Sequence, residues 1–375
     1  MEPHINALSI EGFRTFRSLN VKGLGQVSLI TGCNNTGKSS ALDALRLLAS
    51  DGSLSVIASI LHSREEDADE GEESARWTEE EGAFPLSSLF HGFPEFSGDL
   101  KPISLSSNGG RRPMELTLTA GWYSEERGDN GSRRLVLQQL LDFGEGDALP
   151  ALILKGPGGE RLLPLPILRR NFPYPHRLRM DAAEEMRLPC QYVSPYGGEQ
   201  TARLGALWDK IALSDQEEDV VEALRIIDSA IVAISMVGGE RPRQHRTAIV
   251  RSKTLPRPVP LRSFGDGMNR LFGIILSLVN AKGGLLLIDE FENGMHHTVQ
   301  TDVWKALFRL AERLDTQVVA TSHSWDAIEA FQKAAAEHPS EGVLVRLSRK
   351  GEDVIPSVFR EDELAVAARE GIEVR

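Results

Sequence analysis

The chain of 375 residues is long enough for two or three domains, and its 41% hydrophobic and 26% charged content is ordinary for a globular protein. Its formal net charge of −12 makes the whole chain a poor non-specific DNA binder, so any contact with nucleic acid needs a local basic patch. The two cysteines, Cys33 and Cys190, lack the spacing of a zinc site. The N-terminal residues lack the basic region and the apolar core of a signal sequence. The apolar runs are too short to span a bilayer. We therefore expect a cytoplasmic protein without a structural disulfide and without a membrane partner.

The first part of the chain predicts a phosphate-binding loop between a strand and a helix. Residues 5–23 alternate as two strands would, and the apolar run 26–31 predicts a buried strand. Residues 32–39 then fit the P-loop pattern G-x-x-x-x-G-K-[ST], and residues 40–48 have the apolar spacing of the helix that must follow. Lys38 supplies charge for the β- and γ-phosphates. The predicted nucleotide-binding residues here are Gly32, Asn34, Asn35, Thr36, Gly37, Lys38, Ser39 and Ser40, with Ser39 also a Mg²⁺ ligand.

The middle of the chain begins with an acidic segment. Residues 63–82 are expected to form a solvated loop, because positions 65–81 hold ten carboxylates and one arginine. From 102 to 166, short β-like runs broken by glycine and proline predict an antiparallel sheet. An arginine-rich stretch follows at 161–180.

Two further segments precede the last third of the chain. Residues 199–235 have helical spacing with a break near Ser214, which predicts two helices. Residues 241–262 carry seven cations and no carboxylate. They predict either a hairpin with a solvated face or a surface for nucleic acid or an acidic partner.

A second half of the nucleotide site is predicted near residue 290. The apolar run 284–288 reads as a buried strand, and Asp289 and Glu290 follow it directly. Carboxylates at the end of a parallel strand lie where α/β sheets bind ligands. We predict that Asp289 binds Mg²⁺ and that Glu290 orients and deprotonates the attacking water. The plainer alternative is that both carboxylates cap the next helix.

The spacing of these motifs resembles that of ABC-type ATPase heads. Lys38 and Asp289 lie 289 − 38 = 251 positions apart, which is unlike small GTPases and similar to ABC heads, where a large region separates the two motifs. In such heads, ATP is held between two facing subunits. The resemblance therefore implies a homodimer or higher homo-oligomer.

The same resemblance implies roles for further residues. Ser263, Gly265 and Gly267 resemble the ABC signature, a turn at a helix N-terminus that binds the γ-phosphate held by the other subunit. His323 ends an apolar run and resembles the switch histidine, a second catalytic residue. Asn293 stands where the D-loop crosses to the partner. Taken alone, the Ser–Gly turn is an ordinary helix cap and the histidine an ordinary structural one.

The motifs together are similar to the ATPase heads of the OLD type, among the AAA-15/AAA-21-like ABC ATPases of prokaryotes. The run Asp-Glu-Phe-Glu-Asn-Gly-Met-His at 289–296 carries most of this resemblance. OLD nucleases continue into a TOPRIM domain, which we do not expect in this chain. It therefore resembles the stand-alone ATPases of antiphage systems such as PARIS and Septu. That likeness implies ATP and Mg²⁺ as cofactors, a separate nuclease as partner, and a role in defence.

The expected fold is an α/β ABC-type ATPase head with a mixed sheet, an antiparallel β subdomain and a helical lobe. The alternative function is a RecF-like DNA-repair clamp, whereas a Rad50-like arm lacks its heptads and a transporter subunit lacks its signature form. We predict one split head over 1–375. Its parts are a nucleotide core at 1–60, 185–198 and 245–375, an acidic loop at 63–82, an antiparallel β insertion at 102–180 and a helical lobe at 199–240.

Overall fold

The structure is a computed structural model. It describes residues 2–63, 84–97, 99–111, 113–127, 133–138, 149–164, 188–195, 201–226, 228–238, 246–338, 341–360 and 363. Three predicted features lie wholly or largely outside the described residues, namely the acidic loop at 63–82, most of the arginine-rich stretch at 161–180, and the start of the basic stretch at 241–245.

The described residues form runs of strands separated by helices. The strands are β1 (Ala7–Phe13), β2 (Phe16–Lys22), β3 (Val27–Gly32), β4 (Ile103–Asn108), β5 (Met114–Arg127), β6 (Arg133–Gln138), β7 (Leu149–Gly156), β8 (Gly159–Pro164), β9 (Cys190–Val193), β10 (Ile231–Val237), β11 (Thr247–Ser252), β12 (Val259–Pro260), β13 (Leu285–Ile288), β14 (Gln317–Thr321), β15 (Gly342–Lys350) and β16 (Asp353–Phe359). The helices are α1 (Lys38–Ala49), α2 (Leu54–His62), α3 (Phe84–Ser87), α5 (Thr201–Ile211), α6 (Asp215–Leu224), the 3₁₀ helix η4 (Leu261–Phe264), α7 (Asp266–Asn280), α8 (His297–Leu314) and α9 (Trp325–Ala335).

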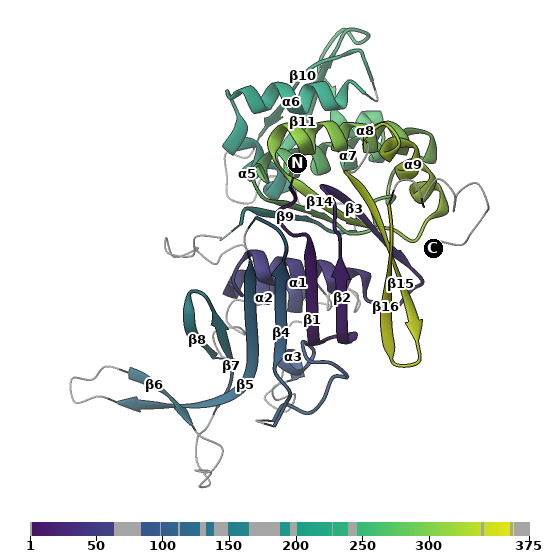
Figure 1. The fold of residues 1–375 in the computed structure, drawn as a ribbon. Helices are drawn as coiled ribbons and strands as arrows, with labels where there is room; N and C mark the ends of the chain where they lie inside the picture. Colours follow the sequence, from purple (N-terminus) through teal and green to yellow (C-terminus); the bar gives the residue numbers. More distant parts are fainter. Residues whose placement is uncertain are drawn as a thin grey trace.

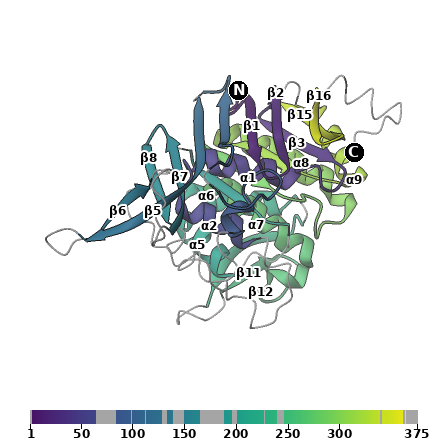
Figure 2. The same cartoon turned by 90° about the horizontal axis from the view of Figure 1, so that it is seen from below.

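Two large sheets organise the molecule. The six-stranded sheet has the order β16-β15-β3-β14-β13-β9, and all its pairs are parallel except β15 with β16. The seven-stranded sheet has the order β2-β1-β4-β5-β7-β8, with β6 paired to β5, and its pairs are antiparallel. Helix α1 contacts strands of both sheets and lies between them (Figure 1). The predicted antiparallel strands of 102–166 thus share a sheet with the N-terminal strands, and β5 and β6 project from the body in both views (Figure 2).

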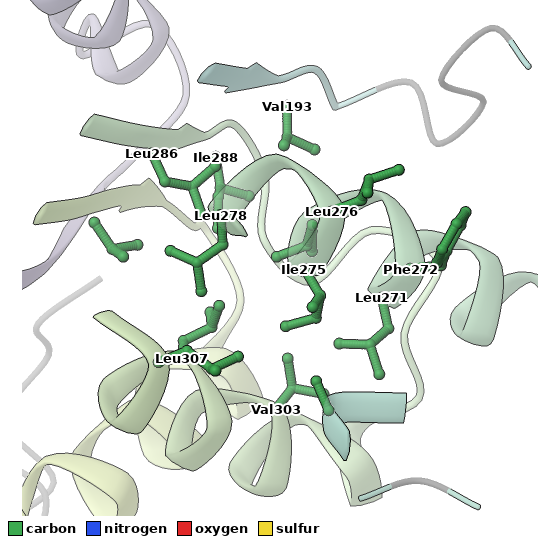
Figure 3. Close-up of a cluster of buried hydrophobic side chains, with 14 of the residues drawn as sticks. Val193, Leu271, Phe272, Ile275, Leu276, Leu278, Leu286, Ile288, Val303 and Leu307 are labelled. Atoms are coloured by element: carbon green, nitrogen blue, oxygen red, sulfur yellow. The ribbon is translucent and has the colours of Figure 1, made fainter. Parts of the chain in front are cut away.

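A hydrophobic core lies on each face of the six-stranded sheet. Alternate residues of β13 serve the two cores, because successive side chains of a strand point to opposite faces. Leu286 and Ile288 belong to one core, and Leu285 and Leu287 belong to the other. Figure 3 shows the first core, where β13 packs against the apolar sides of α7 and α8. The second core contains α1 and the apolar face of the antiparallel sheet.

The prediction of helices over 199–235 was correct for the first two thirds and wrong at its end. Helices α5 and α6 are present, with Ser214 as the N-cap of α6, as expected. Residues Ile231–Val237 instead form β10, which pairs antiparallel with β11. Apolar residues in this short run fit a strand as well as a helix, and pairing with β11 decides for the strand. The hairpin expected in 241–262 is confirmed by the antiparallel pairing of β11 with β12.

These elements confirm the predicted fold class, an α/β P-loop head with a mixed sheet, an antiparallel β subdomain and helices over the other face. The exact division into core, insertion and lobe stays a prediction. Among the residues that the structure describes, no helix combines the length and the apolar character that crossing a membrane would require.

Candidate nucleotide site

The P-loop joins the buried strand β3 to helix α1, as the motif requires. Gly32 and Gly37 have positive φ angles of 145° and 89°, which side-chain-bearing residues rarely adopt. A Cβ atom at Gly37 would lie 2.5 Å from the Phe16 ring, so the loop packs too closely for any larger residue. The N-cap residue of α1 is Gly37, which has no side chain to bond the first backbone N–H groups, and such groups suit an anion.

Lys38 turns back over this loop. Its Nζ atom donates hydrogen bonds to the carbonyl oxygens of Gly32, at 2.8 Å, and Cys33, at 3.1 Å. Burial lowers the pKa of the Lys38 amino group, and the nearby carboxylates of Asp289 and Glu290 oppose this effect. The charge predicted to serve phosphates thus lies close to the predicted metal and catalytic carboxylates.

Asp289 is the buried carboxylate at the end of β13. Two hydroxyl groups bond to it, from Thr321 to Oδ1 at 2.5 Å and from Tyr192 to Oδ2 at 3.3 Å, and the Ser39 hydroxyl of the P-loop lies near it. Burial raises the pKa of Asp289, and the hydroxyl groups of Thr321 and Ser39 work in the opposite direction. The two predicted Mg²⁺ ligands, Ser39 and Asp289, therefore meet, although 250 residues separate them (289 − 39).

Glu290 adopts an unusual backbone conformation. Its φ angle of 47° lies in the left-handed region, which costs a residue with a side chain about 1 to 2 kcal/mol. The Glu290 N–H donates to the Thr321 hydroxyl at 2.9 Å, and this bond holds the strained turn. Asn293 Nδ2 donates to Glu290 Oε2 at 2.6 Å and to the Pro195 carbonyl at 3.1 Å. Within one chain, Asn293 thus contacts the predicted base, and its crossing to a partner stays a prediction.

His323 follows β14 and lies beside a third carboxylate of the same turn. Its backbone N–H donates to Glu292 Oε1 at 3.0 Å, and its Nδ1 atom lies 3.2 Å from the same oxygen. The His323 side chain is half exposed, whereas that of Glu292 is largely buried. An imidazole oriented by a carboxylate has the right form to act on a phosphate or on a water molecule.

The predicted signature residues lie at the start of α7. Ser263 is exposed in η4, and Gly265, with a φ angle of 98°, is the N-cap residue of α7. Gly267 packs against the turn after Glu290, since a Cβ atom there would lie 3.0 Å from the Gly294 carbonyl oxygen. Among the described residues, no hydrogen bond joins 263–267 to the P-loop of the same chain.

Sequence reasoning missed two residues that hold this site together. Arg270, a buried residue of α7, donates to the carbonyl oxygens of Asp289, at 3.0 Å, and Glu290, at 3.4 Å, and also to that of Ser194. The sequence did carry one sign of this role, because Arg270 is a charged residue within the mostly apolar helix that follows the predicted signature. Tyr192 is the other, and a tyrosine in the short strand β9 carried no distinguishing signal.

One family model and one sequence relative match this chain. Residues 204–328 match the family described as "AAA domain, putative AbiEii toxin, Type IV TA system", a range that contains α7, Asp289 and His323 but not the P-loop. An "ATP/GTP phosphatase" of Helicobacter pylori is 21% identical over 388 residues, covering 96% of this chain and 96% of that protein.

Among solved structures, three Smc heads are similar to this chain. An Smc head bound to the C-winged helix domain of ScpA has 12% identity and a TM-score of 0.48, over 97% of this chain and 100% of that one. The SMC head domain from Thermotoga maritima has 13% identity and a TM-score of 0.42, over 95% and 98%. An Smc head with an extended coiled coil, bound to the C-terminal domain of ScpA derived from Pyrococcus furiosus, has 10% identity and a TM-score of 0.43, over 99% and 100%. The family match and the sequence relative together support an ATPase of the AAA or ABC type.

Proposed function

We propose that this chain is an ATP-binding and ATP-hydrolysing switch subunit that works as a head-to-head pair. Each ATP would lie between the P-loop of one copy and residues 263–267 of the other. Binding closes the pair, and hydrolysis opens it again, so that the γ-phosphate sets the state of the molecule. A homodimer or higher homo-oligomer follows from this arrangement.

One observation carries the proposal, namely the approach of the Ser39 hydroxyl to the Asp289 carboxylate beside Lys38. It brings a hydroxyl from the P-loop to a carboxylate from a distant strand, and both are hard oxygen ligands of the kind that Mg²⁺ prefers. The N–H groups at the start of α1 and the tight loop that Gly32 and Gly37 allow suit the phosphates. Magnesium, when bound, supplies positive charge that stabilises the transferring phosphoryl group.

The residues of the chain divide the work of hydrolysis. Glu290 accepts a proton from the attacking water, whose oxygen forms a bond to the γ-phosphorus while the bond to the β–γ bridging oxygen breaks. Lys38 binds the β- and γ-phosphates, and Asn293 orients the Glu290 carboxylate. His323, held beside Glu292, contacts the γ-phosphate. The products are ADP and phosphate.

The proposal extends to the purpose of the switch. The resemblance to OLD-type ATPases supports control of a separate effector, a nuclease, in prokaryotic antiphage defence. The matching family description names a toxin and a toxin–antitoxin system, which is consistent with an ATPase that acts through a partner protein.

A RecF-like DNA clamp is a second candidate, and one observation favours it. The hairpin β11–β12 presents Arg251, Lys253 and Arg257 to solvent directly before the signature segment. DNA binding that weakens steeply as salt is added would favour the clamp over the effector switch.

The test of the proposed function is the Lys38→Ala variant. Removing the ammonium group should weaken ATP binding on the order of 100-fold, since charge-assisted contacts to phosphate are lost. Isothermal titration calorimetry measures the affinity. The matched control is Lys101→Ala, which removes an exposed lysine before β4 and should bind ATP as the unaltered chain does. Equal ATP affinity in the two variants would reject the nucleotide site.

A further inference from the structure

Asp289, the predicted Mg²⁺ ligand, accepts a hydrogen bond from Tyr192, a residue that belongs to none of the predicted sequence motifs. Its Oδ1 atom accepts from Thr321, at 2.5 Å, at the end of the neighbouring strand β14. Its Oδ2 atom accepts from the Tyr192 hydroxyl, at 3.3 Å, which comes from β9 on the other side of β13. Each oxygen of the carboxylate is therefore bonded by a hydroxyl from a different flanking strand, and the Ser39 hydroxyl of the P-loop lies nearby.

The parallel register of β9 and β13 explains why Tyr192 can reach Asp289. Tyr192 is paired with Leu287, and Val193 is paired with Ile288. Tyr192 and Leu287 face the core that contains α1, whereas Val193 and Ile288 face the core that contains α7. The tyrosine ring therefore lies on the P-loop side of the sheet, and its hydroxyl extends along the strand direction to the carboxylate that ends β13.

A buried arginine holds the tyrosine ring in place. The Arg46 guanidinium lies 4.1 Å from the centre of the Tyr192 ring, a cation–π contact. Arg46 donates to Asp43 Oδ1 at 3.1 Å and to the Ser59 hydroxyl of α2 at 2.8 Å. These bonds use the guanidinium edges and leave its face for the ring.

The hydrogen bonds that fix Arg46 continue through Asp43 to Arg14, which lies in the turn between β1 and β2. Asp43 Oδ2 accepts from Arg14 at 3.1 Å, and Arg14 and Asp43 are both almost completely buried. Arg14 also donates to the carbonyl oxygen of Ile60 in α2, and its own φ angle is 49°. Buried, mutually hydrogen-bonded charges are costly to rearrange. The Tyr192 ring is thus fixed by a rigid set of residues from α1, α2 and the β1–β2 turn.

We propose that Tyr192 is a positioning residue for the Mg²⁺ site, and that its hydroxyl fixes the orientation of the Asp289 carboxylate toward Ser39. This inference rests on the proposed function, because it concerns the same nucleotide site. Groups that hydrogen-bond to a metal ligand orient it and tune its affinity for the metal. Tyr192 does not touch the nucleotide in this account, and it acts only through Asp289.

The experiment compares nucleotide binding with and without Mg²⁺ in the Tyr192→Phe variant. Phenylalanine keeps the ring against Arg46 and removes only the hydroxyl. A fluorescent ATP analogue is titrated in EDTA and then over a series of Mg²⁺ concentrations. We expect the affinity in EDTA to stay within about twofold, and the Mg²⁺ concentration for half-maximal tightening to rise about 3- to 10-fold, as for the loss of one hydrogen bond of ordinary strength.

Two further variants separate the possible outcomes. Tyr123→Phe, in the antiparallel sheet, removes a buried tyrosine hydroxyl elsewhere and should leave the Mg²⁺ midpoint unchanged. Asp289→Asn should abolish the Mg²⁺ effect, and its failure to do so would reject the metal site itself. If Asp289→Asn behaves as expected, an unchanged midpoint in Tyr192→Phe overturns the inference. An equal loss of affinity with and without Mg²⁺ overturns it too, because that result shows a structural role alone.

Discussion

At the scale of single residues, the site depends on Glu290 and the groups that fix it. The strained φ angle of 47° places Glu290 just past the end of β13, and the Thr321 hydroxyl bonds to both its N–H group and Asp289. Strained backbone in a functional site persists only where its surroundings hold it. Thr321 and Asn293 provide that support here, so small changes at Glu290 should affect chemistry far more than binding.

The first prediction at this scale concerns the base itself. Glu290→Gln keeps the shape and the bond from Asn293 but cannot accept the proton, so ATP turnover should fall about 100-fold or more. ATP affinity should remain close to that of the unaltered chain. Phosphate release and calorimetry measure the two quantities. The control is Glu312→Gln, an exposed carboxylate on α8. Normal turnover in Glu290→Gln would remove Glu290 from the role of base.

The second residue-scale prediction concerns the switch histidine. His323→Ala should reduce turnover on the order of 100-fold, because a positioned group at the γ-phosphate is lost, while ATP affinity changes little. The neighbouring surface provides a matched control in His297→Ala, where an exposed histidine of α8 is removed. The same assay is used for both variants, and equal rates would assign His323 a structural role only.

At the scale of elements, the site is a set of loops that end buried strands. β3, β13 and β14 are adjacent in the six-stranded sheet in the order β3-β14-β13, and the P-loop, Asp289 and His323 follow them. Parallel strands end at one edge of a sheet, so residues distant in the chain converge there. The P-loop must then turn sharply into α1, and Gly37 makes that turn possible.

Substitution at Gly37 tests the fit of this element. Gly37→Ala must place a Cβ atom 2.5 Å from the buried Phe16 ring at a φ angle of 89°, and should cost about 2 to 5 kcal/mol of stability. Gly351→Ala, at a φ angle of 65° with open space around it, isolates the backbone cost, about 1 to 2 kcal/mol. Urea unfolding compares the two. A smaller loss at Gly37 than at Gly351 would contradict the close packing.

At the scale of the whole molecule, the two proposed halves of the ATP site lie on different parts of one chain. The P-loop cluster lies where β3, β13 and β14 end, whereas Ser263 and Gly265 are exposed at the start of α7, which packs on one face of the six-stranded sheet. Gly267 nevertheless packs against the turn that follows Glu290. A second copy facing the first would supply the missing half. Because Gly267 contacts the turn after Glu290, binding of that copy would also affect the position of Glu290.

This arrangement predicts dimers that depend on ATP. In a Glu290→Gln background, ATP should convert monomers into dimers, and Ser263→Glu should prevent this conversion because its charge repels the γ-phosphate of the facing copy. ATP affinity of the monomer should be unchanged. Ser357→Glu, at an exposed serine of β16, is the control for added charge. Sedimentation velocity measures the masses, and ATP-dependent dimers of Ser263→Glu would contradict the sandwich.

Much of the fold and of the site could be predicted from short segments. The strand–loop–helix unit at 26–48 and the strand before Asp289 were predicted close to their observed bounds, because burial and glycine positions leave a local pattern. The segment at 231–237 could not be assigned correctly, since its structure depends on pairing with β11. Residue roles beyond the motifs were equally hidden, as Arg270 shows.

The sequence by itself determined the phosphate loop, the two carboxylates after β13 and the histidine after β14, because each of these is a pattern of neighbouring residues. Only the tertiary structure decided that Tyr192, 97 positions before Asp289, bonds to it, and that Arg46 and Asp43 hold the tyrosine in place. Strand order and register bring such residues together. Strand order and register depend on packing over the whole chain, so they cannot be inferred from the sequence spacing of the residues that they bring together.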